Sequence, residues 1–328
     1  MNRQFWMREM VVIFLYCISF GLPITARADG YYLHCCAADG KLEEVKRIVE
    51  TEHPDIDWHS STEGTPLAVA CMYRHLEVVK YLLEKGADPN ASCLECALAF
   101  FSGGGREKDE SAIEIVKLLL SKGARVDDIY GQEKTTALIE MCRNLTGLSG
   151  SKQNAETPRR KDYMLQIVDL LLSNGATVNC CDRCGITPLH YAANSGYTDL
   201  VERLFSRGAE KSINAKMITK ETPLTLALRE ITNREKDKER LEQRVQMVYM
   251  LVDKGARFDE ANIPNESGYT PLHFAAITGV SRIVKDLLEK GNVNVNQKSN
   301  EGYTALDYAQ ACGHADIVDL LVRHGAQK

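Results

Sequence analysis

Residues 187–209 have the sequence TPLHYAANSGYTDLVERLFSRGA, and residues 270–292 repeat it in the same phase as TPLHFAAITGVSRIVKDLLEKGN. The pattern begins again at Thr65 with TPLAVACMYRHLEVVKYLLEKGA and at Thr304 with TALDYAQACGHADIVDLLVRHGA. Internal similarity at this spacing predicts a stack of short structural units, because each unit buries its apolar face only against its neighbours.

Each part of the repeated pattern has a physical role. The Thr hydroxyl can cap a first helix, and the following Pro fits the first helical position, where no hydrogen-bond donor is lost. Paired small residues such as Ala192 and Ala193 keep that helix thin, so that neighbouring units can stack closely. A Leu pair such as Leu287 and Leu288 falls on the inner side of a second helix, and the Gly that follows suits a left-handed helix end. The pattern therefore predicts two helices per unit.

These residues resemble the ankyrin repeat family, whose hallmarks are the TPLH turn, the Ala pair, a Leu-rich second helix and a Gly-Ala ending. The resemblance implies an all-α solenoid of stacked helix-turn-helix repeats with β-hairpin loops between them. It covers essentially all of residues 29–328. The predicted repeats lie at about 30–60, 61–90, 91–128, 129–180, 181–214, 215–263, 264–298 and 299–328.

Three of the predicted repeats carry extra residues between their two helices, around residues 101–111, 144–161 and 230–244. The polar stretch 149–161 contains Gly and Pro and ends in a small basic cluster, which predicts a mobile loop. In residues 230–244, acidic and basic side chains alternate at helical spacing, which predicts a lengthened, solvated helix. The plainest interpretation of all three insertions is tolerated growth at the surface.

The first 28 residues resemble an export signal. Arg3 and Arg8 lie in a basic start, an apolar stretch follows from Met10 to Ile24, and Ala26 and Ala28 place small side chains where a signal peptidase cleaves. We expect cleavage after Ala28 and a periplasmic or secreted protein. The alternatives are an uncleaved segment that anchors the protein in a membrane, and a different export route that leads into a host cell.

The chain is mildly acidic, with 40 Lys and Arg against 45 Asp and Glu. This balance offers no broad basic surface of the kind that neutralises phosphates, so we expect no nucleic-acid partner. The repeats leave no stretch long enough for a second, catalytic domain. We expect a monomer that binds another protein.

Residues that suggest chemistry have structural interpretations. His34, His190 and His273 recur at one phase of the repeat, and the family resemblance implies that this histidine bonds neighbouring backbone in the turn. No nucleophile or acid recurs with them, and phosphate-binding and metalloprotease motifs are absent from the sequence. We therefore expect no enzyme activity, no resident metal and no cofactor.

One cysteine cluster stays open to a functional interpretation. Cys180, Cys181 and Cys184 lie in a predicted hairpin, where side chains are expected to project into solvent. They are candidates for a disulfide in an oxidising compartment, or for a redox or metal-binding site. Cysteines elsewhere mostly occupy the small-residue positions of the repeat, where the thiol serves as a small apolar side chain.

The resemblance implies that hairpin turns and first helices line the binding face. Residues that vary between otherwise similar repeats are candidates for partner contact, because stacking does not require them. On hairpins they are Trp58, His59, Asp182, Arg183, Lys216, Met217, Tyr269, Lys298 and Tyr303, and near the ends of first helices they are Asn194, Ser195, Ile277 and Thr278. Aromatic and Arg side chains are enriched at interface hot spots, so the leading anchors are Trp58, Arg183, Tyr269 and Tyr303.

Three functions follow from these patterns. The first is an exported, non-enzymatic binding protein that uses the hairpin and first-helix face. The second is a cell-envelope protein with a redox or metal-handling role at the cysteine cluster. The third is a secreted effector that binds a host protein.

Overall fold

A computed structural model describes residues 24–60, 64–90, 92–98, 106–150, 157–230, 238–258, 264–290 and 293–327. The chain consists of two compact units, Met1–Asp128 and Ile129–Lys328. Within the described residues, the secondary structure is helical apart from isolated β-bridges that join Ser60 to Gly64 and Tyr130 to Thr135. The predicted all-α fold is confirmed, and its hairpin loops are tight turns without extended strands in the described ranges.

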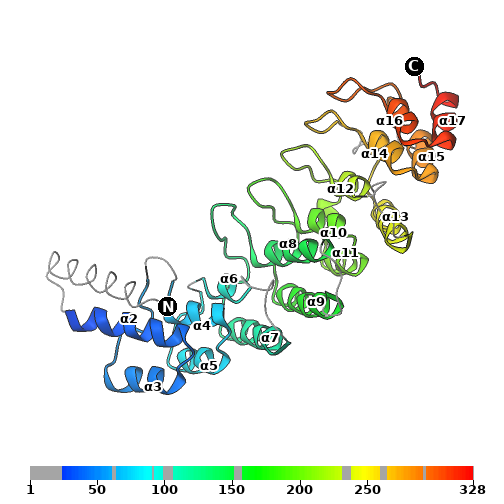
Figure 1. Cartoon of the computed structure of the whole chain (residues 1–328). Coiled ribbons are helices and arrows are strands. Elements are labelled where there is room, and N and C mark those ends of the chain that lie inside the picture. Colours follow the sequence, from blue (N-terminus) through cyan, green and yellow to red (C-terminus); the bar gives the residue numbers. More distant parts are fainter. Residues whose placement is uncertain are drawn as a thin grey trace. The chain divides into compact units, whose positions relative to one another are not determined.

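The described residues of the first unit form three packed pairs of helices (Figure 1). They are α2 (Ile24–Ala38) with α3 (Leu42–Thr51), α4 (Pro66–Tyr73) with α5 (Leu76–Glu84), and α6 (Cys93–Leu98) with α7 (Arg106–Ser121). First helices contact first helices, since α4 packs against both α2 and α6. Fully buried aliphatic side chains such as Leu33, Leu67 and Leu82 form the core of this unit.

In the second unit, five pairs of helices lie within the described residues and are built in the same way (Figure 1). The first helices are α8 (Ala137–Gly150), α10 (Pro188–Ser195), α12 (Pro223–Arg229), α14 (Pro271–Thr278) and α16 (Ala305–Cys312). Their partners are α9 (Thr157–Ser173), α11 (Thr198–Phe205), α13 (Lys238–Asp253), α15 (Ser281–Lys290) and α17 (Ala315–Arg323), and a 3₁₀ turn, η1 (Ala209–Ser212), follows α11. The apolar core lies between the two helix rows and between successive repeats.

The first helices begin and end as their sequences predict. The hydroxyls of Thr65, Thr187, Thr222 and Thr304 each accept a hydrogen bond from the backbone three residues later. A Pro follows the first three of these residues. At the other end of α10, Gly196 adopts a left-handed conformation that an L side chain rarely takes.

In several repeats, an Asp or Asn side chain near the end of the repeat bonds the corresponding segment of the next repeat. Asn90 accepts the backbone N–H of Arg125 at 2.9 Å, and Asn214 accepts that of Arg257 at 3.1 Å. These contacts span 35 and 43 residues because the intervening repeats carry insertions, whereas the equivalent contact from Asp88 to Asp57 spans 31. The stacking geometry is therefore kept while the chain length between stacking contacts varies.

The insertions lengthen helices. Helix α13 begins at Lys238, which confirms the predicted lengthened helix for the part of 230–244 that is described. The loop predicted at 149–161 is wrong at both ends, because α8 continues to Gly150 and α9 begins at Thr157. Residues 101–105, 151–156 and 231–237 lie outside the described residues.

The predicted export signal lies mostly outside the described residues, which begin at Ile24. Helix α2 runs from Ile24 to Ala38 and so continues through Ala28, the expected cleavage position. Among helices of the described residues, none combines the length and apolar composition that crossing a bilayer requires.

Candidate functional site

Each of the last four repeats presents a tight hairpin turn of the same construction. In each turn the backbone N–H of the first residue donates to the carbonyl of the fifth, at 2.9–3.1 Å, in Asp182–Ile186, Met217–Glu221, Asn265–Tyr269 and Ser299–Tyr303. The fourth residue has a positive φ, and it is Gly185, Lys220, Gly268 and Gly302 in turn. The turn in residues 130–135 is similar and one residue longer, with Lys134 at the left-handed position.

Backbone hydrogen bonds join the hairpins at 130–135, 182–186 and 217–221 in succession, and also join the hairpin at 265–269 to the one at 299–303. The N–H of Arg183 donates to the carbonyl of Glu133 at 2.9 Å, and the N–H of Ile218 donates to that of Cys184 at 2.9 Å. The N–H of Asn300 donates in the same way to Ser267 at 3.1 Å. The hairpins thus form an ordered row that projects to one side of the second unit (Figure 1). This row, residues 130–135, 182–186, 217–221, 265–269 and 299–303, together with helices α8, α10, α12, α14 and α16, is called the hairpin face.

Large apolar side chains are exposed on or directly beside the hairpin row. Ile129 is 67% exposed, Ile218 is 64% exposed and Tyr303 is 52% exposed. Elsewhere among the described residues of the second unit, Val322 on α17 is the large aliphatic side chain with comparable exposure, at 51%. Exposed apolar groups on an ordered backbone are typical of surfaces that bind other proteins.

A tyrosine cluster lies at the C-terminal end of the hairpin face. The hydroxyls of Tyr269 and Tyr308 are 2.8 Å apart, and the ring of Tyr269 stacks on Phe274 with centroids 5.4 Å apart. Tyr303 packs edge-on against Tyr308 at 5.8 Å. Burial, together with the hydrogen bond to Tyr308, raises the pKa of Tyr269. Tyr269 is therefore a neutral, half-buried support, and Tyr303 is the exposed member of the cluster.

The four predicted anchors differ in their surroundings. Arg183 and Tyr303 are exposed on hairpins, as expected. Trp58 belongs to the first unit and is half-buried, with its ring 5.9 Å from both Tyr31 and His34 and directly beside Gly30. A side chain at Gly30 would overlap the Trp58 indole, so Trp58 packs the first repeat together.

Three other predicted contact residues are buried. Asp182 accepts hydrogen bonds within its own hairpin, and the hydroxyls of Ser195 and Thr278 donate to carbonyls of their own helices. The expectation that the Asp182 side chain projects into solvent is wrong, because that carboxylate organises the turn.

The remaining predicted contact residues retain some exposure. His59, Lys216 and Lys298 are exposed, and Met217, Asn194 and Ile277 are half-buried. The backbone carbonyls of Asn194 and Ile277 accept hydrogen bonds from Arg244 and His314, respectively. These two helix-end residues thus take part in stacking as well as lying near the surface.

The recurring histidine bonds backbone, as the family resemblance implied. In His190 the ring Nδ1 lies 3.1 Å from the Thr187 nitrogen and Nε2 lies 3.4 Å from the Glu221 carbonyl. His273 makes the same contacts with Thr270 and the Tyr303 carbonyl. Each ring therefore links the start of a first helix to the following hairpin.

His34 differs from these two histidines. Its Nε2 is buried and has no hydrogen-bond partner among the described atoms. Burial and the neighbouring His59 lower its pKa to about 4.

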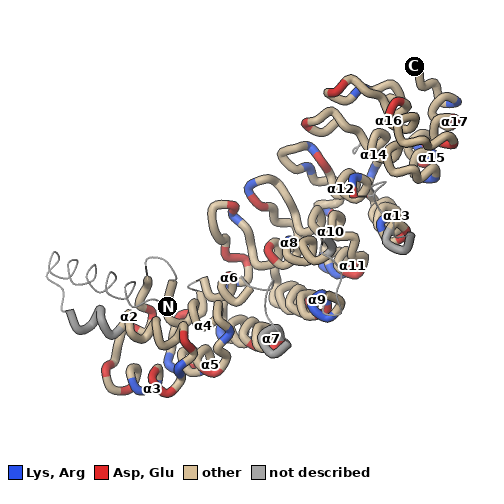
Figure 2. Tube along the Cα trace, in the orientation of Figure 1, with Lys and Arg blue, Asp and Glu red and all other residues tan. Residues whose placement is uncertain are grey.

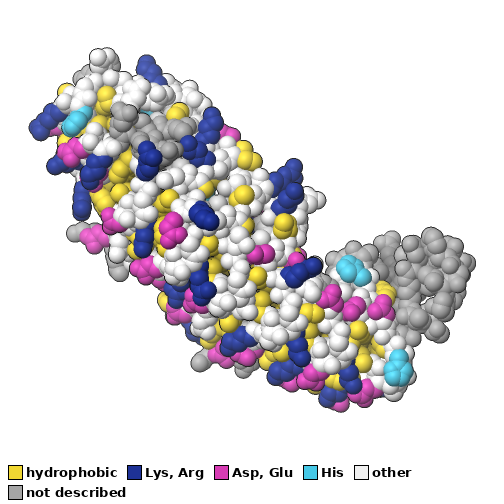
Figure 3. Space-filling model, turned by 180° about the vertical axis from the view of Figure 1, so that it is seen from behind, with side chains coloured by type: hydrophobic (Ala, Val, Ile, Leu, Met, Phe, Trp, Pro, Cys, Tyr) yellow, Lys and Arg dark blue, Asp and Glu magenta, His cyan; other side chains and the backbone are white. Residues whose placement is uncertain are grey.

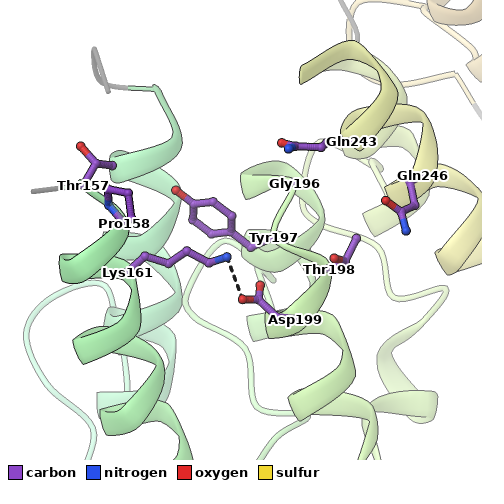
Figure 4. A pocket seen from close by; sticks show the side chains of 9 residues that line it. All are labelled: Thr157, Pro158, Lys161, Gly196, Tyr197, Thr198, Asp199, Gln243 and Gln246. Atoms are coloured by element: carbon purple, nitrogen blue, oxygen red, sulfur yellow. Dashed lines mark ion pairs between the residues drawn. The ribbon is translucent and has the colours of Figure 1, made fainter. Parts of the chain in front are cut away.

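The insertions create a separate pocket of about 420 Å³ (Figure 4). One wall comes from the start of α9, the floor from the turn before α11, and the other wall from the lengthened part of α13. The lining residues are Thr157, Pro158, Lys161, Gly196, Tyr197, Thr198, Asp199, Gln243 and Gln246. The Lys161 ammonium lies 2.7 Å from the Asp199 carboxylate and 4.5 Å from the centre of the Tyr197 ring, so its charge is matched inside the pocket.

The cysteines of the predicted cluster, all of which are described, form no disulfide and no set of metal ligands. All ten cysteines of the described residues are free thiols, with Cys181 and Cys184 exposed and Cys180 half-buried. The Cys180 sulfur lies 3.5 Å from the Thr136 hydroxyl. Within the described ranges, no three His, Cys, Asp or Glu side chains are placed to hold a metal ion.

Sequence reasoning missed Ile129 and Ile218, the two most exposed large apolar side chains described. A signal for Ile218 was available, because it occupies the same hairpin position as Arg183, Glu266 and Asn300. An apolar residue where other repeats place polar ones indicates contact with something outside the repeat.

The family model for ankyrin repeats (three copies) matches residues 9–93, 160–242 and 239–328. The matches leave residues 94–159 uncovered, and there the structure places α6, α7 and α8, which pack as the helices of the matched repeats do.

Several known proteins are similar to this chain. The human transient receptor potential cation channel subfamily A member 1 is 28% identical over 91% of this chain and 27% of its own length. A putative ankyrin repeat protein of Fowlpox virus is 32% identical over 58% of this chain and 52% of its own length. An ankyrin repeat and KH domain-containing protein of Caenorhabditis briggsae is 29% identical over 65% of this chain and 7% of its own length. The chain thus spans about half or less of the length of these relatives.

Proposed function

The chain belongs to the ankyrin-repeat family, and from this premise we propose that it is a non-enzymatic protein that binds a partner protein through the hairpin face. Ankyrin repeats suggest protein–protein interaction as a general role. The observation that carries the choice of face is the exposure of Ile218 and Tyr303 on hairpins joined by backbone hydrogen bonds. An ordered surface loses little conformational entropy on binding, so its apolar groups contribute more fully to affinity.

We also propose that the protein is exported by its N-terminal segment and acts outside the cytoplasm, in the periplasm or as a secreted protein. The basic start, the apolar stretch and the small residues before Asp29 support this proposal. Mass spectrometry of the N-terminus of the cell-derived protein is the test. A chain that begins at Asp29 is expected, whereas an intact Met1 terminus in a membrane fraction would favour the uncleaved anchor.

The pocket beside α13 is a second candidate for partner contact. Its support is geometric, because two insertion-lengthened helices enclose a cavity that repeats without insertions lack the chain to form. Its ion pair is internally matched, so recognition there would depend on shape and on the amide groups of Gln243 and Gln246.

The experiment is cross-linking of the tagged chain in its native compartment, with captured proteins quantified by mass spectrometry. The hairpin variant is Ile218→Ser with Tyr303→Ala, and the pocket variant is Gln246→Arg. The control is Val322→Ser, which removes an apolar side chain of similar exposure from α17. We expect the hairpin variant to lose the captured partner and both other variants to keep it.

Two results would contradict this assignment. Loss of the partner in the pocket variant alone would move the binding site to the inserted edge. Equal capture by all variants would show that neither surface is the binding site.

A further inference from the structure

Two neighbouring hairpins present more positive charge at their surface than their sequences suggest. Residues 182–186 contain one acidic and one basic residue, and residues 216–221 contain two Lys and one Glu. Both acidic side chains, Asp182 and Glu221, are buried in the structure and are held there by different contacts.

The Asp182 carboxylate is buried and accepts hydrogen bonds from its own turn. The side chain is 8% exposed, and one carboxylate oxygen accepts the backbone N–H groups of Cys184 and Ile186 at 2.8 and 2.9 Å. The other oxygen accepts the hydroxyl of Tyr191 at 3.4 Å. A carboxylate with these donors is neither exposed nor available to balance the adjacent Arg183.

The Glu221 carboxylate is buried and forms an ion pair with Arg229. The side chain is 5% exposed and lies 2.8 Å from the Arg229 guanidinium. It also accepts the hydroxyl of Thr219 at 3.1 Å. The Glu221 charge is therefore paired with α12 and does not offset the lysines of its hairpin.

The result is a cationic surface around an exposed isoleucine. Arg183, Lys216 and Lys220 are exposed, Ile218 lies between the two lysines in sequence, and its N–H bonds the carbonyl of Cys184 on the neighbouring hairpin. Figure 2 marks basic positions in blue along the traces of these loops, which precede α10 and α12.

Outside these two hairpins, exposed basic residues of the row stand close to exposed acids, as Lys134 does beside Glu133 and Lys298 near Glu301. The adjacent hairpins carry the exposed acids Glu133 and Glu266, and the last hairpin carries Glu301. In the view from behind, acidic and basic side chains are interspersed over the visible surface (Figure 3). The cationic surface formed by Arg183, Lys216, Ile218 and Lys220 is called the basic hairpin patch.

We propose that the basic hairpin patch binds an acidic segment of the partner protein in which carboxylates flank an aliphatic or aromatic side chain. The proposal rests on the proposed function and adds the chemistry of the partner to it. The apolar partner residue covers Ile218, and the flanking carboxylates pair with Arg183 and Lys220. Charge complementarity of this kind sets orientation and association rate, and salt screens it.

The test uses the full chain and short fluorescein-labelled peptides in which Glu, Gln or Lys alternates with Leu. Fluorescence anisotropy at low salt is expected to show the Glu peptide binding about tenfold tighter than the Gln peptide, a difference that shrinks at about 0.5 M salt. The variant Arg183→Glu with Lys220→Glu should lose this preference and bind the Lys peptide instead. Ile218→Ser should weaken binding of the Glu and Gln peptides equally.

The matched control is Lys285→Glu with Arg323→Glu, which changes the net charge equally on α15 and α17. It should keep the preference for the Glu peptide, and circular dichroism should show native helix content in every variant. The proposal is overturned by equal binding of the Glu and Gln peptides, by a preference that survives Arg183→Glu with Lys220→Glu, or by no binding up to about 1 mM. If Ile218→Ser with Tyr303→Ala still loses its cellular partner, the proposed function stands without the acidic segment.

Discussion

At the scale of single residues, a histidine connects a first helix with the next hairpin in two repeats, through His190 and His273. The ring of His190 is fully buried between Thr187 and the carbonyl of Glu221. A neutral imidazole can accept one hydrogen bond and donate another, which these two neighbours require. Protonation would place an unpaired positive charge in that buried position.

This burial predicts acid sensitivity. Burial lowers the pKa of His190 to about 4, although hydrogen bonds to backbone carbonyls oppose the shift. The unfolded chain, with a pKa of about 6.5, then binds more protons than the folded chain between these two values. The stability is complete above about pH 6.5, falls as the pH drops toward 4 and levels off below it. Urea unfolding of the wild type should show a lower free energy of unfolding at pH 5 than at pH 7. In His190→Gln this difference between the two pH values should be smaller by about 2 kcal/mol. An unchanged pH dependence in the variant would contradict the assignment.

Two hairpin glycines predict different costs for the same substitution. Gly268 and Gly302 both have positive φ, but a Cβ at Gly268 would lie 2.5 Å from the Asn300 nitrogen, whereas one at Gly302 would meet no atom within 4 Å. Gly302→Ala should cost about 1 kcal/mol, from the left-handed backbone alone. Gly268→Ala should cost at least about 2 kcal/mol, because it also displaces the hairpin that bonds Ser267. Chemical unfolding that shows equal losses of stability for the two variants would contradict the close approach of Gly268 to Asn300.

At the scale of elements, a side chain at or near the start of the second helix bonds the end of the first helix of the preceding repeat in three repeats. His75 bonds the Ala38 carbonyl at 3.0 Å, and His314 bonds the Ile277 carbonyl at 3.3 Å. Both histidines stand directly before their helices. In the repeat whose second helix is the lengthened α13, Arg244 takes the same place on the Asn194 carbonyl and against Gly196. The insertion has therefore added helix before Arg244 and left the stacking contact in place.

Truncation of this arginine should separate α13 from α10. Arg244 is 5% exposed, so Arg244→Ala removes a charged donor from a carbonyl that water cannot easily reach. We expect a loss of about 2 kcal/mol in the free energy of unfolding. The neighbouring Gln243→Ala, at an exposed position of the same helix, should change stability by less than about 0.5 kcal/mol. Similar effects of both substitutions would mean that helix propensity, and not the contact with α10, governs the loss.

At the scale of the whole molecule, the helices form two units whose boundary follows Asp128. One of the predicted repeats begins at residue 129, so the boundary coincides with a junction between repeats. The ten cysteines of the described residues are distributed through both units without a disulfide, and five of them are buried in helices. This distribution bears on the redox hypothesis, because buried thiols react slowly.

Thiol reactivity should follow burial. Burial raises the pKa of Cys96 to about 12 and also raises the pKa of Cys142, whereas Cys181 and Cys184 are exposed. Ellman titration of the native chain without reductant should show Cys181 and Cys184 reacting first. The denatured chain should then release every thiol. A deficit of two thiols in the denatured chain would indicate a disulfide and favour the alternative role of the cysteine cluster.

Local sequence patterns were sufficient to predict the repeat, its paired helices and the Thr and Gly residues at their ends. They were also sufficient to predict that the TPLH histidine bonds backbone. These features depend on residues a few positions apart, so periodicity and capping residues reveal them. The surface required the assembled stack. Asp182 and Glu221 look like surface charges in sequence, and Trp58 looks like an exposed anchor, yet contacts within and between elements bury all three to different degrees. The carboxylates of Asp182 and Glu221 bond groups only two to nine positions away, but the folded form of the turn decides which of these groups they reach. Trp58 meets His34 and Tyr31, 24 and 27 positions earlier, because packing of the first repeat brings the rings together, and a local residue pattern does not contain that contact.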